Sequence, residues 1–189
     1  EFFAHPVARN FVLTGGSALA AFHLFHRRSK DLDLFTHAPE VLDEAESSVN
    51  ALIARFAGEM IRARRAEMFR QFVFRSRDEI VQVDLVQDVG PQYGAPLERD
   101  RIRVDSIENI GANKVTALFG RTESKDFVDL YFIVKAGYRL ERLFELATEK
   151  DLGLTEFYFA GAMLQVDKLK RLPEMIAPVT IEELQAFYH

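Results

Sequence analysis

Short apolar runs with polar ends fill the first half of the chain, whereas apolar residues at helical spacing dominate the second half. The first-half runs are rich in β-branched and aromatic residues and are too short for helices, which favours strands. The exceptions are an apolar, helix-forming run at residues 17–26 and an amphipathic stripe at 40–57, both predicted as helices. We expect strands at residues 11–14, 31–36, 60–65, 69–75, 80–87 and 102–104.

From Ser106 the pattern is helical to the end of the chain, because apolar positions recur at the spacing of amphipathic helices. The chain therefore divides near Asp105 into an α/β lobe, residues 1–105, and a helical lobe, residues 106–189. In the region 155–164, the three aromatic residues 157–159 are predicted to belong to the helix core rather than to stack on bases. We expect helices at residues 107–119, 125–135, 140–149, 155–164 and 181–188.

Composition narrows the class of protein. With 189 residues, 48% of them hydrophobic and 17 of them Phe, the chain can build a core for one domain or two small lobes. It has no cysteine, which excludes disulfides and thiolate metal sites and is compatible with the reducing cytoplasm, where we expect the protein. No apolar run approaches the ~20 residues of a membrane span, so we expect no membrane association.

The net charge of −5 does not draw the protein to nucleic acid, so RNA binding would need a local basic patch. The arginines of the sheet region are the candidates for such a patch. For most of them a solvated surface is the favoured interpretation, and an RNA-facing surface is the alternative. They are Arg62, Arg64, Arg65, Arg70, Arg75, Arg77, Arg99, Arg101 and Arg103.

A turn of two glycines lies between the first predicted strand and the first predicted helix. Gly15 and Gly16 allow a tight turn and close approach of a ligand to the backbone, and Ser17 is expected to begin the helix. A strand, a glycine turn and a helix N-terminus together form a seat for phosphate groups. The three residues are therefore candidate phosphate ligands. An ordinary turn with Ser17 as N-cap is the alternative.

Acidic residues lie in two of the predicted strands, at residues 31–36 and 80–87. Because strand side chains alternate between faces, Asp31 and Asp33 share one face. At about 6.6 Å apart they repel by roughly 2–3 kcal/mol at an effective dielectric near 20, a cost that a divalent cation would turn into affinity. In the strand at 80–87, the apolar neighbours of Asp84 are expected to face the core, which places Asp84 on the opposite face. Paired carboxylates with a phosphate seat predict metal-assisted chemistry on a nucleoside triphosphate.

Four stretches in this order resemble the AbiEii/MenT group of nucleotidyltransferase toxins, a branch of the polymerase-beta-like superfamily. The resemblance implies a polymerase-beta-like α/β lobe with a mixed sheet, followed by a helical lobe. It also implies transfer of a nucleoside monophosphate from an NTP to an acceptor hydroxyl. The stretches are LTGGSALAAFHLFHRRSKDLDLF at 13–35, VDLV at 83–86, NIGANKVTALFGR at 109–121 and KDFVDLYFIV at 125–134.

The resemblance implies a site for Mg²⁺ or Mn²⁺ with Asp31, Asp33 and Asp84 as its ligands. The nucleophile would be activated by the metal ions, by Asp84, or by both. A solvent-facing strand residue is the alternative interpretation of Asp84. Just before these carboxylates, Arg28 and Ser29 are candidate phosphate ligands, and an exposed turn residue is the alternative for Arg28.

The resemblance adds three catalytic residues from the helical lobe: Lys114, Asp126 and Asp129. Lys114 is expected on the flank of its helix, where it would contact the triphosphate, and a solvated lysine is the alternative. From that flank position, Lys114→Ala is expected to leave thermal stability nearly unchanged. Asp126 and Asp129 share a helix face, and one of them, left open, is implied to point to the site. The preference of helix N-termini for acidic residues is the alternative explanation.

The implied substrate is an NTP, the implied acceptor is the 3′ end of a tRNA or another RNA, and the implied partner is a cognate antitoxin protein. Two alternatives stay open: a protein or small-molecule acceptor, and an inactive nucleotide-binding or partner-binding module. The intact carboxylates and Lys114 argue against the inactive module. A kinase is disfavoured because the chain has no Walker-type Gly-x-x-x-x-Gly-Lys stretch.

Overall fold

The computed structural model describes residues 1–189, which form two compact units. The expected division at Asp105 coincides with one boundary between the units, but two short segments from the first 105 residues belong with the helices. None of the helices combines the length and the apolar character needed to cross a membrane. The sheet unit comprises Glu1–Ala18, Ser29–Val89 and Pro96–Asp105, and the helical unit comprises Leu19–Arg28, Gly90–Ala95 and Ser106–His189.

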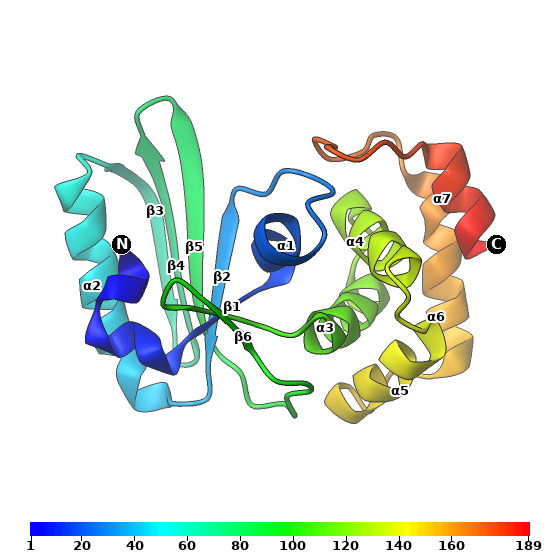
Figure 1. Ribbon diagram of the computed structural model, residues 1–189, viewed down its shortest axis with the longest axis horizontal. Coiled ribbons are helices and arrows are strands. Elements are labelled where there is room, and N and C mark those ends of the chain that lie inside the picture. The colour runs from blue at the N-terminus through cyan, green and yellow to red at the C-terminus, as the bar shows by residue number, and fades with distance from the viewer. The chain divides into compact units, whose positions relative to one another are not determined.

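A mixed seven-stranded sheet forms the sheet unit, in the order β3-β4-β5-β2-β1-β7-β6 (Figure 1). This confirms the expected α/β fold class with a mixed sheet. The pairs β2–β5 and β1–β7 are parallel, and the other neighbours are antiparallel. The strands are β1 (Val12–Thr14), β2 (Asp31–Thr36), β3 (Glu59–Ala66), β4 (Phe69–Ser76), β5 (Glu79–Gln87), β6 (Leu97–Arg99) and β7 (Ile102–Val104). Of these, the three-residue β6 was not expected from the sequence.

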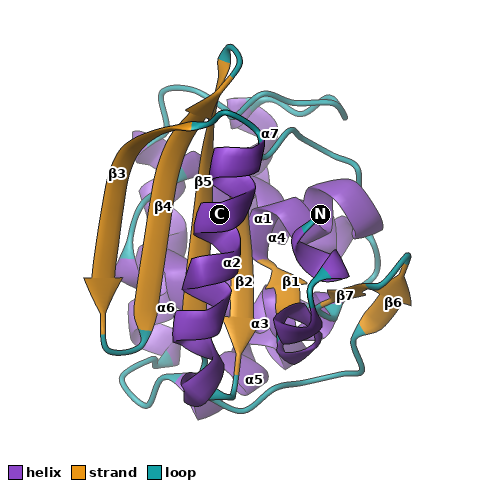
Figure 2. Cartoon of the chain, turned by 90° about the vertical axis from the view of Figure 1, so that its left-hand side faces the viewer, coloured by secondary structure: helices purple, strands orange, loops and turns teal.

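Helix α2 (Leu42–Arg55) covers one face of the sheet, as Figure 2 shows. It begins later than expected, because Pro39–Val41 forms a 3₁₀ turn, η4. The apolar stripe of the helix is buried, as are the sheet residues Phe72 and Leu85. Two further 3₁₀ helices near the N-terminus, η1 (Phe2–Ala4) and η2 (Pro6–Asn10), contact α2. This face of the sheet is therefore covered by α2.

Two of the arginines expected on a solvated surface pair with α2, and of these Arg70 is buried whereas Arg65 stays exposed as expected. Arg70 is buried, and its guanidinium lies 2.7 Å from Asp43 and 2.8 Å from Glu46. Arg65 on the neighbouring strand pairs with the same two carboxylates at 2.9 and 3.5 Å. Burial alone would lower the pKa of Arg70, but the hydrogen bonds and charges of Asp43 and Glu46 raise it on balance. The buried Arg70 therefore helps to hold the helix to the sheet, whereas an exposed pair such as Arg65–Asp43 contributes little.

The first helix differs from the expected 17–26. Its α-helical part, α1 (Gly15–Ala18), begins two residues before Ser17, so Ser17 is not the N-cap. It continues as a π-helical segment, η3 (Leu19–His23), in which the Leu24 amide donates to the Leu19 carbonyl at 2.7 Å. The helix ends early because Phe25 adopts a left-handed conformation, with φ of 52°.

The helical unit contains all five helices expected after Ser106, and every helix begins and ends within one residue of its predicted bounds. Helix α3 contacts α4, α5 and α6, and α7 packs against α4. The hydroxyl of Ser106 caps α3 by accepting from the Asn109 amide at 3.0 Å. The helices are α3 (Ile107–Gly120), α4 (Ser124–Lys135), α5 (Leu140–Lys150), α6 (Glu156–Met163) and α7 (Ile181–Tyr188), and the 3₁₀ turn η5 (Leu164–Lys168) follows α6.

The aromatic residues of α6 do not all belong to the core, which corrects the expectation from the sequence. Phe159 is buried, but Phe157 is 82% exposed and Tyr158 is 58% exposed. Successive helical positions point about 100° apart, and the packed face of α6 includes Phe159 and Ala162 but neither Phe157 nor Tyr158.

Candidate active site

Three acidic residues share the sheet face opposite α2. In the parallel ladder between β2 and β5, Asp33 lies beside Asp84, and Asp31 lies beside Gln82. Alternation along each strand places Leu34 and Leu85 in the buried core on the α2 side and the three carboxylates on the other face. The expected grouping of Asp31, Asp33 and Asp84 on one face is therefore observed, with all three half-buried.

Two glutamine side chains hold the carboxylate of Asp84. Gln71 donates to one carboxylate oxygen and Gln82 donates to the other, each at 3.0 Å. Gln71 is 8% exposed, and its Oε1 atom is buried without a hydrogen-bond partner. An ionised carboxylate only accepts hydrogen bonds, so the amide nitrogen has to face Asp84 even though this leaves the amide oxygen unpaired. The orientation of Asp84 is therefore fixed at the cost of a buried acceptor.

Gly15 packs closely against the side chain of Asp33, whereas the predicted approach of a ligand to this turn stays a prediction. The residue adopts a φ of +66°, and a Cβ atom there would overlap the Asp33 carboxylate and lie 3.0 Å from its carboxyl carbon. Gly16 is buried, and the Ser17 hydroxyl donates a short hydrogen bond to the backbone carbonyl of Asp31. The glycine turn and the two carboxylates of β2 thus form one packed arrangement.

The carboxylates of Asp31, Asp33 and Asp84 are suited to a hard divalent cation, since Mg²⁺ and Mn²⁺ prefer carboxylate oxygens. The cradle at Gly15 keeps backbone and carboxylate close together, which also fits a site for a metal-bound phosphate. Nowhere in the structure do three or more His, Asp or Glu side chains gather closely enough to hold a metal ion together. The carboxylates of Asp33 and Asp84 on neighbouring strands repel each other. Asp84 is held instead by the side-chain amides of Gln71 and Gln82.

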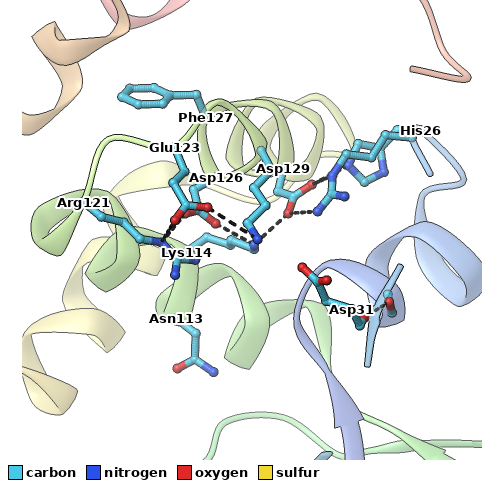
Figure 3. Close-up of polar contacts among 12 residues, drawn as sticks. His26, Asp31, Asn113, Lys114, Arg121, Glu123, Asp126, Phe127 and Asp129 are labelled. Atoms are coloured by element: carbon cyan, nitrogen blue, oxygen red, sulfur yellow. Dashed lines mark hydrogen bonds and ion pairs between the residues drawn. The ribbon is translucent and has the colours of Figure 1, made fainter. Parts of the chain in front are cut away.

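The helical unit contains a buried charge network centred on Lys114 (Figure 3). The Lys114 ammonium lies 2.7 Å from a carboxylate oxygen of Asp126 and 2.7 Å from one of Asp129. Both aspartates are fully buried, and Lys114 is 6% exposed. They come from successive helices, α3 and α4, so the network fastens these helices together.

The side chains of Arg27, His26 and Arg121 complete the network. Arg27 binds Asp129 with two hydrogen bonds of 2.6 and 2.8 Å, and the His26 ring lies 2.7 Å from the same carboxylate. Arg121, which is half-exposed, lies 2.8 Å from Asp126. Each carboxylate is therefore held by at least two cationic or polar side chains, the condition under which a buried charge is tolerated.

The network sets the pKa values of its members. Burial alone would raise the pKa of Asp129, but the charge of Lys114 and the hydrogen bonds from Arg27 and His26 hold it well below the usual range. The pKa of Asp126 is lowered in the same way, against its burial, by Lys114 and Arg121. Burial would lower the pKa of Lys114, but Asp129 and Asp126 raise it on balance. All three groups are therefore charged at neutral pH.

The expected flank position of Lys114 is wrong. The side chain is buried between two helices, because two carboxylates that are themselves buried require its charge. The expectation that Lys114→Ala leaves thermal stability nearly unchanged is therefore withdrawn. Asp126 and Asp129 both contact Lys114, and that one of them points to the active site stays a prediction.

The two candidates just before β2 lie apart from this network. Arg28 is largely exposed and pairs with Glu174 at 3.0 Å, and Ser29 is half-buried. Sequence reasoning missed Arg27 and His26, which are buried. The backbone amide of Arg28 donates to Glu174, and the His26 carbonyl accepts from residues 176 and 177, which turns Arg27 inward. No periodicity in the sequence distinguishes Arg27 from Arg28, because this pairing partner lies near the other end of the chain.

The chain is similar to one protein family and to several solved structures. A family model described as nucleotidyl transferase AbiEii toxin, type IV TA system, matches residues 2–186. The structure of JHP933 from Helicobacter pylori is 20% identical, with a TM-score of 0.59 over 98% of this chain and 87% of that chain. MenT4, a nucleotidyltransferase toxin from Mycobacterium tuberculosis H37Rv, is 15% identical, with a TM-score of 0.62 over 94% of this chain and 72% of that chain. At these identities the likeness shows the fold. No curated protein matched the chain.

Proposed function

The chain belongs to the AbiEii family of nucleotidyl transferase toxins, and from this we propose that it transfers a nucleoside monophosphate from an NTP to an acceptor hydroxyl in a reaction that requires Mg²⁺ or Mn²⁺. The observation that carries the proposal is the placement of Asp33 beside Asp84 on adjacent strands, with Gly15 packed against the Asp33 carboxylate. This arrangement brings an oxygen-rich ligand set to a glycine turn, as chemistry on a metal-bound triphosphate requires.

In the proposed reaction the acceptor hydroxyl loses its proton and its oxygen bonds to the α-phosphorus of the NTP. The bond from the α-phosphorus to the oxygen that bridges it to the β-phosphorus breaks, and pyrophosphate leaves with that oxygen. Asp84 is suited to receive the proton because two amides keep its carboxylate in one orientation. The backbone amides at Gly16 and Ser17 are suited to the triphosphate, since the Ser17 hydroxyl is already engaged with Asp31.

The proposed metal ligands are Asp31, Asp33 and Asp84. When bound, the cation would neutralise phosphate charge and lower the pKa of the attacking hydroxyl. The chain itself contributes the placement of the carboxylates, through the strand register and the Gly15 turn. The catalytic roles of Lys114, Asp126 and Asp129, and phosphate contacts by Arg28 and Ser29, rest on the family resemblance and stay predictions.

We further propose that the acceptor is an RNA, with the 3′ end of tRNA as the first candidate, and that the protein works in the cytoplasm and has a cognate antitoxin. The family description names a toxin of a toxin–antitoxin system, which supports the antitoxin. A protein or small-molecule acceptor is the alternative within the same enzyme class. An inactive module would bind an NTP without releasing pyrophosphate.

The direct test incubates the protein with each NTP in turn, labelled at the α-phosphate, together with Mg²⁺ and total RNA, and resolves the products on a gel. We expect label to enter RNA with one or more of the NTPs and pyrophosphate to be released. Chelation of the metal should abolish both signals. A parallel incubation with total protein distinguishes the alternative acceptor, and the absence of pyrophosphate release under every condition would contradict enzymatic activity.

A further inference from the structure

The outer face of α6 is unusual for the surface of a protein. The helix has apolar residues all round, from Phe157 to Met163, yet it buries only Phe159 and Ala162. Phe157, Tyr158 and, just after the helix, Leu164 are 82%, 58% and 50% exposed. A helix that is apolar on all sides is normally buried in a core or against a partner, because exposure of apolar surface to water is unfavourable.

These exposed residues line a hollow of about 730 Å³. The Phe119 and Tyr158 rings lie 6.2 Å apart between centroids, and the Phe157 ring meets Tyr158 edge-on at 5.7 Å. Ala160 and Gly161 keep part of the lining flat, and Gly161 has open space around the position of a Cβ. The hollow thus presents aromatic rings beside a shallow apolar surface.

A second hollow, of about 820 Å³, adjoins the first, and Thr122 lines both. It is basic, since its lining includes Lys125 and the exposed cations Lys168, Lys170 and Arg171. None of these last three forms an ion pair with a carboxylate. The acidic residue of its lining, Glu123, already lies within 4 Å of Arg121 and Lys125. In a chain of net charge −5, this hollow is a local concentration of positive charge.

We propose that the two hollows form one binding surface for single-stranded RNA, with bases stacked on Phe157 and Tyr158 and phosphates on Lys168, Lys170 and Arg171. Exposed rings next to unpaired cations are the combination by which proteins bind single strands without reading their sequence. A duplex fits less well, because its bases are stacked inside and do not reach the rings. An apolar peptide would use the rings but has no need of the cations.

This surface deepens the proposed function by naming the residues that would bind an RNA acceptor, and in that respect it rests on the proposed function. The binding itself requires neither NTP nor metal. It can therefore be measured by fluorescence anisotropy with a labelled, unstructured RNA of about 12 nucleotides, within the range of single-strand site sizes. The protein is used whole, without nucleotide, at KCl concentrations from about 50 to 200 mM.

We expect Phe157→Ala to weaken binding by roughly 5- to 100-fold, the effect of losing one stacked base. The variant K168Q/K170Q/R171Q should make the dependence of log affinity on log salt shallower by about 2, since each phosphate contact on a single strand contributes about 0.7. The matched controls are Leu152→Ala, an apolar residue 93% exposed outside both hollows, and Arg139→Gln, an exposed arginine of the same unit. Both controls should bind RNA as the wild type does.

Equal RNA binding by wild type and Phe157→Ala would overturn the proposal. So would binding of an acidic, Phe-containing peptide in place of RNA, or a dimer that Phe157→Ala dissociates. Asp33→Asn separates this surface from the reaction, because it should lose transfer and keep RNA binding. If the wild type binds RNA as expected but transfers nothing, the proposed function fails and the surface stands. If transfer to RNA occurs and Phe157→Ala binds normally, the surface fails and the function stands.

Discussion

Gly15 and Asp33 show how much of the candidate site depends on single residues. A glycine at φ +66° lets the backbone of the turn lie against a carboxylate, and no other residue type fits both the angle and the space. The sequence predicted that a ligand approaches this turn, and the structure shows in addition that the Asp33 side chain packs against it. At the same scale, Gln71 and Gln82 orient Asp84, a role that no motif revealed because a glutamine on a strand usually faces solvent.

Gly15→Ala should lower both stability and transfer. The left-handed conformation costs an alanine roughly 1–2 kcal/mol, and the Cβ would also displace the Asp33 carboxylate. We expect a fall in Tm of several degrees, measured by thermal unfolding, and a larger proportional loss of labelled NTP incorporation. Gly120→Ala is the control, because a Cβ at that helical position meets nothing within 4 Å. A Gly15→Ala protein with the Tm and activity of the Gly120→Ala protein would show that the turn tolerates a side chain.

At the scale of elements, the buried charges between α3 and α4 are the least predictable feature. The Asp-x-x-Asp spacing at 126 and 129 indicates a shared helix face, but nothing local indicates that Lys114 lies buried between them. Burial of a lysine is normally unfavourable, so Lys114 was expected on the flank of its helix, in contact with the triphosphate, with a solvated lysine as the alternative. Only the packing of the two helices makes the charge necessary.

Lys114→Met should destabilise the protein by about 3–5 kcal/mol, because it leaves two buried carboxylates without their shared cation. Urea denaturation measures this change in the free energy of unfolding. Lys135→Met, which removes an exposed lysine from α4, should change it by less than about 0.5 kcal/mol. The double variant K114M/D126N should recover part of the loss, because Asp126 would otherwise keep only the half-exposed Arg121 as a cationic partner. A loss below about 1 kcal/mol for Lys114→Met would contradict the structural role.

Acid should weaken the same contact between helices. Asp126 and Asp129 have folded-state pKa values below the unfolded value near 3.9, so the unfolded chain binds more protons in acid. Their stabilising contribution is complete above about pH 5 and declines as the pH falls below the unfolded pKa toward the folded values. The slope is up to about 1.4 kcal/mol per pH unit for each carboxylate. Urea denaturation between pH 7 and pH 3 should show this slope reduced in Asp129→Asn, and an unchanged slope would exclude Asp129 as its source.

At the scale of the whole molecule, the sequence predicted the fold class, most of the strands and every long helix, because these follow from periodicity within a short window. It did not predict that residues 19–28 and 90–95 join the helical unit. Those segments are held by distant partners: His26 by residues 176 and 177, and Tyr93 through its carbonyl, which accepts from the Ser106 hydroxyl. The exposure of Phe157 was missed for a similar reason, since an apolar residue in an apolar helix indicates burial unless the packing is known.

The same limit applies to the candidate site. Strand alternation was sufficient to predict which way Asp31, Asp33 and Asp84 face, and strand pairing brings the three onto one face, whereas their role as metal ligands stays a prediction. Motif spacing was insufficient to choose between Arg27 and Arg28, or to describe the surroundings of Lys114, because those depend on contacts between segments far apart in the chain. The positions of candidate site residues are therefore more readily predicted in the sheet unit than in the helical unit.

The most direct test is calorimetric titration of the whole protein with an NTP analogue that cannot be cleaved between its α- and β-phosphates, with and without Mg²⁺. We expect wild type and Asp78→Asn, an exposed carboxylate at the turn between β4 and β5, to bind the analogue only with the metal. Asp33→Asn, with its fold checked by thermal unfolding, should lose roughly tenfold or more in affinity, about 1.4 kcal/mol. Metal-dependent binding by Asp33→Asn with the wild-type Kd would remove the carboxylate pair from the site and contradict the proposed chemistry.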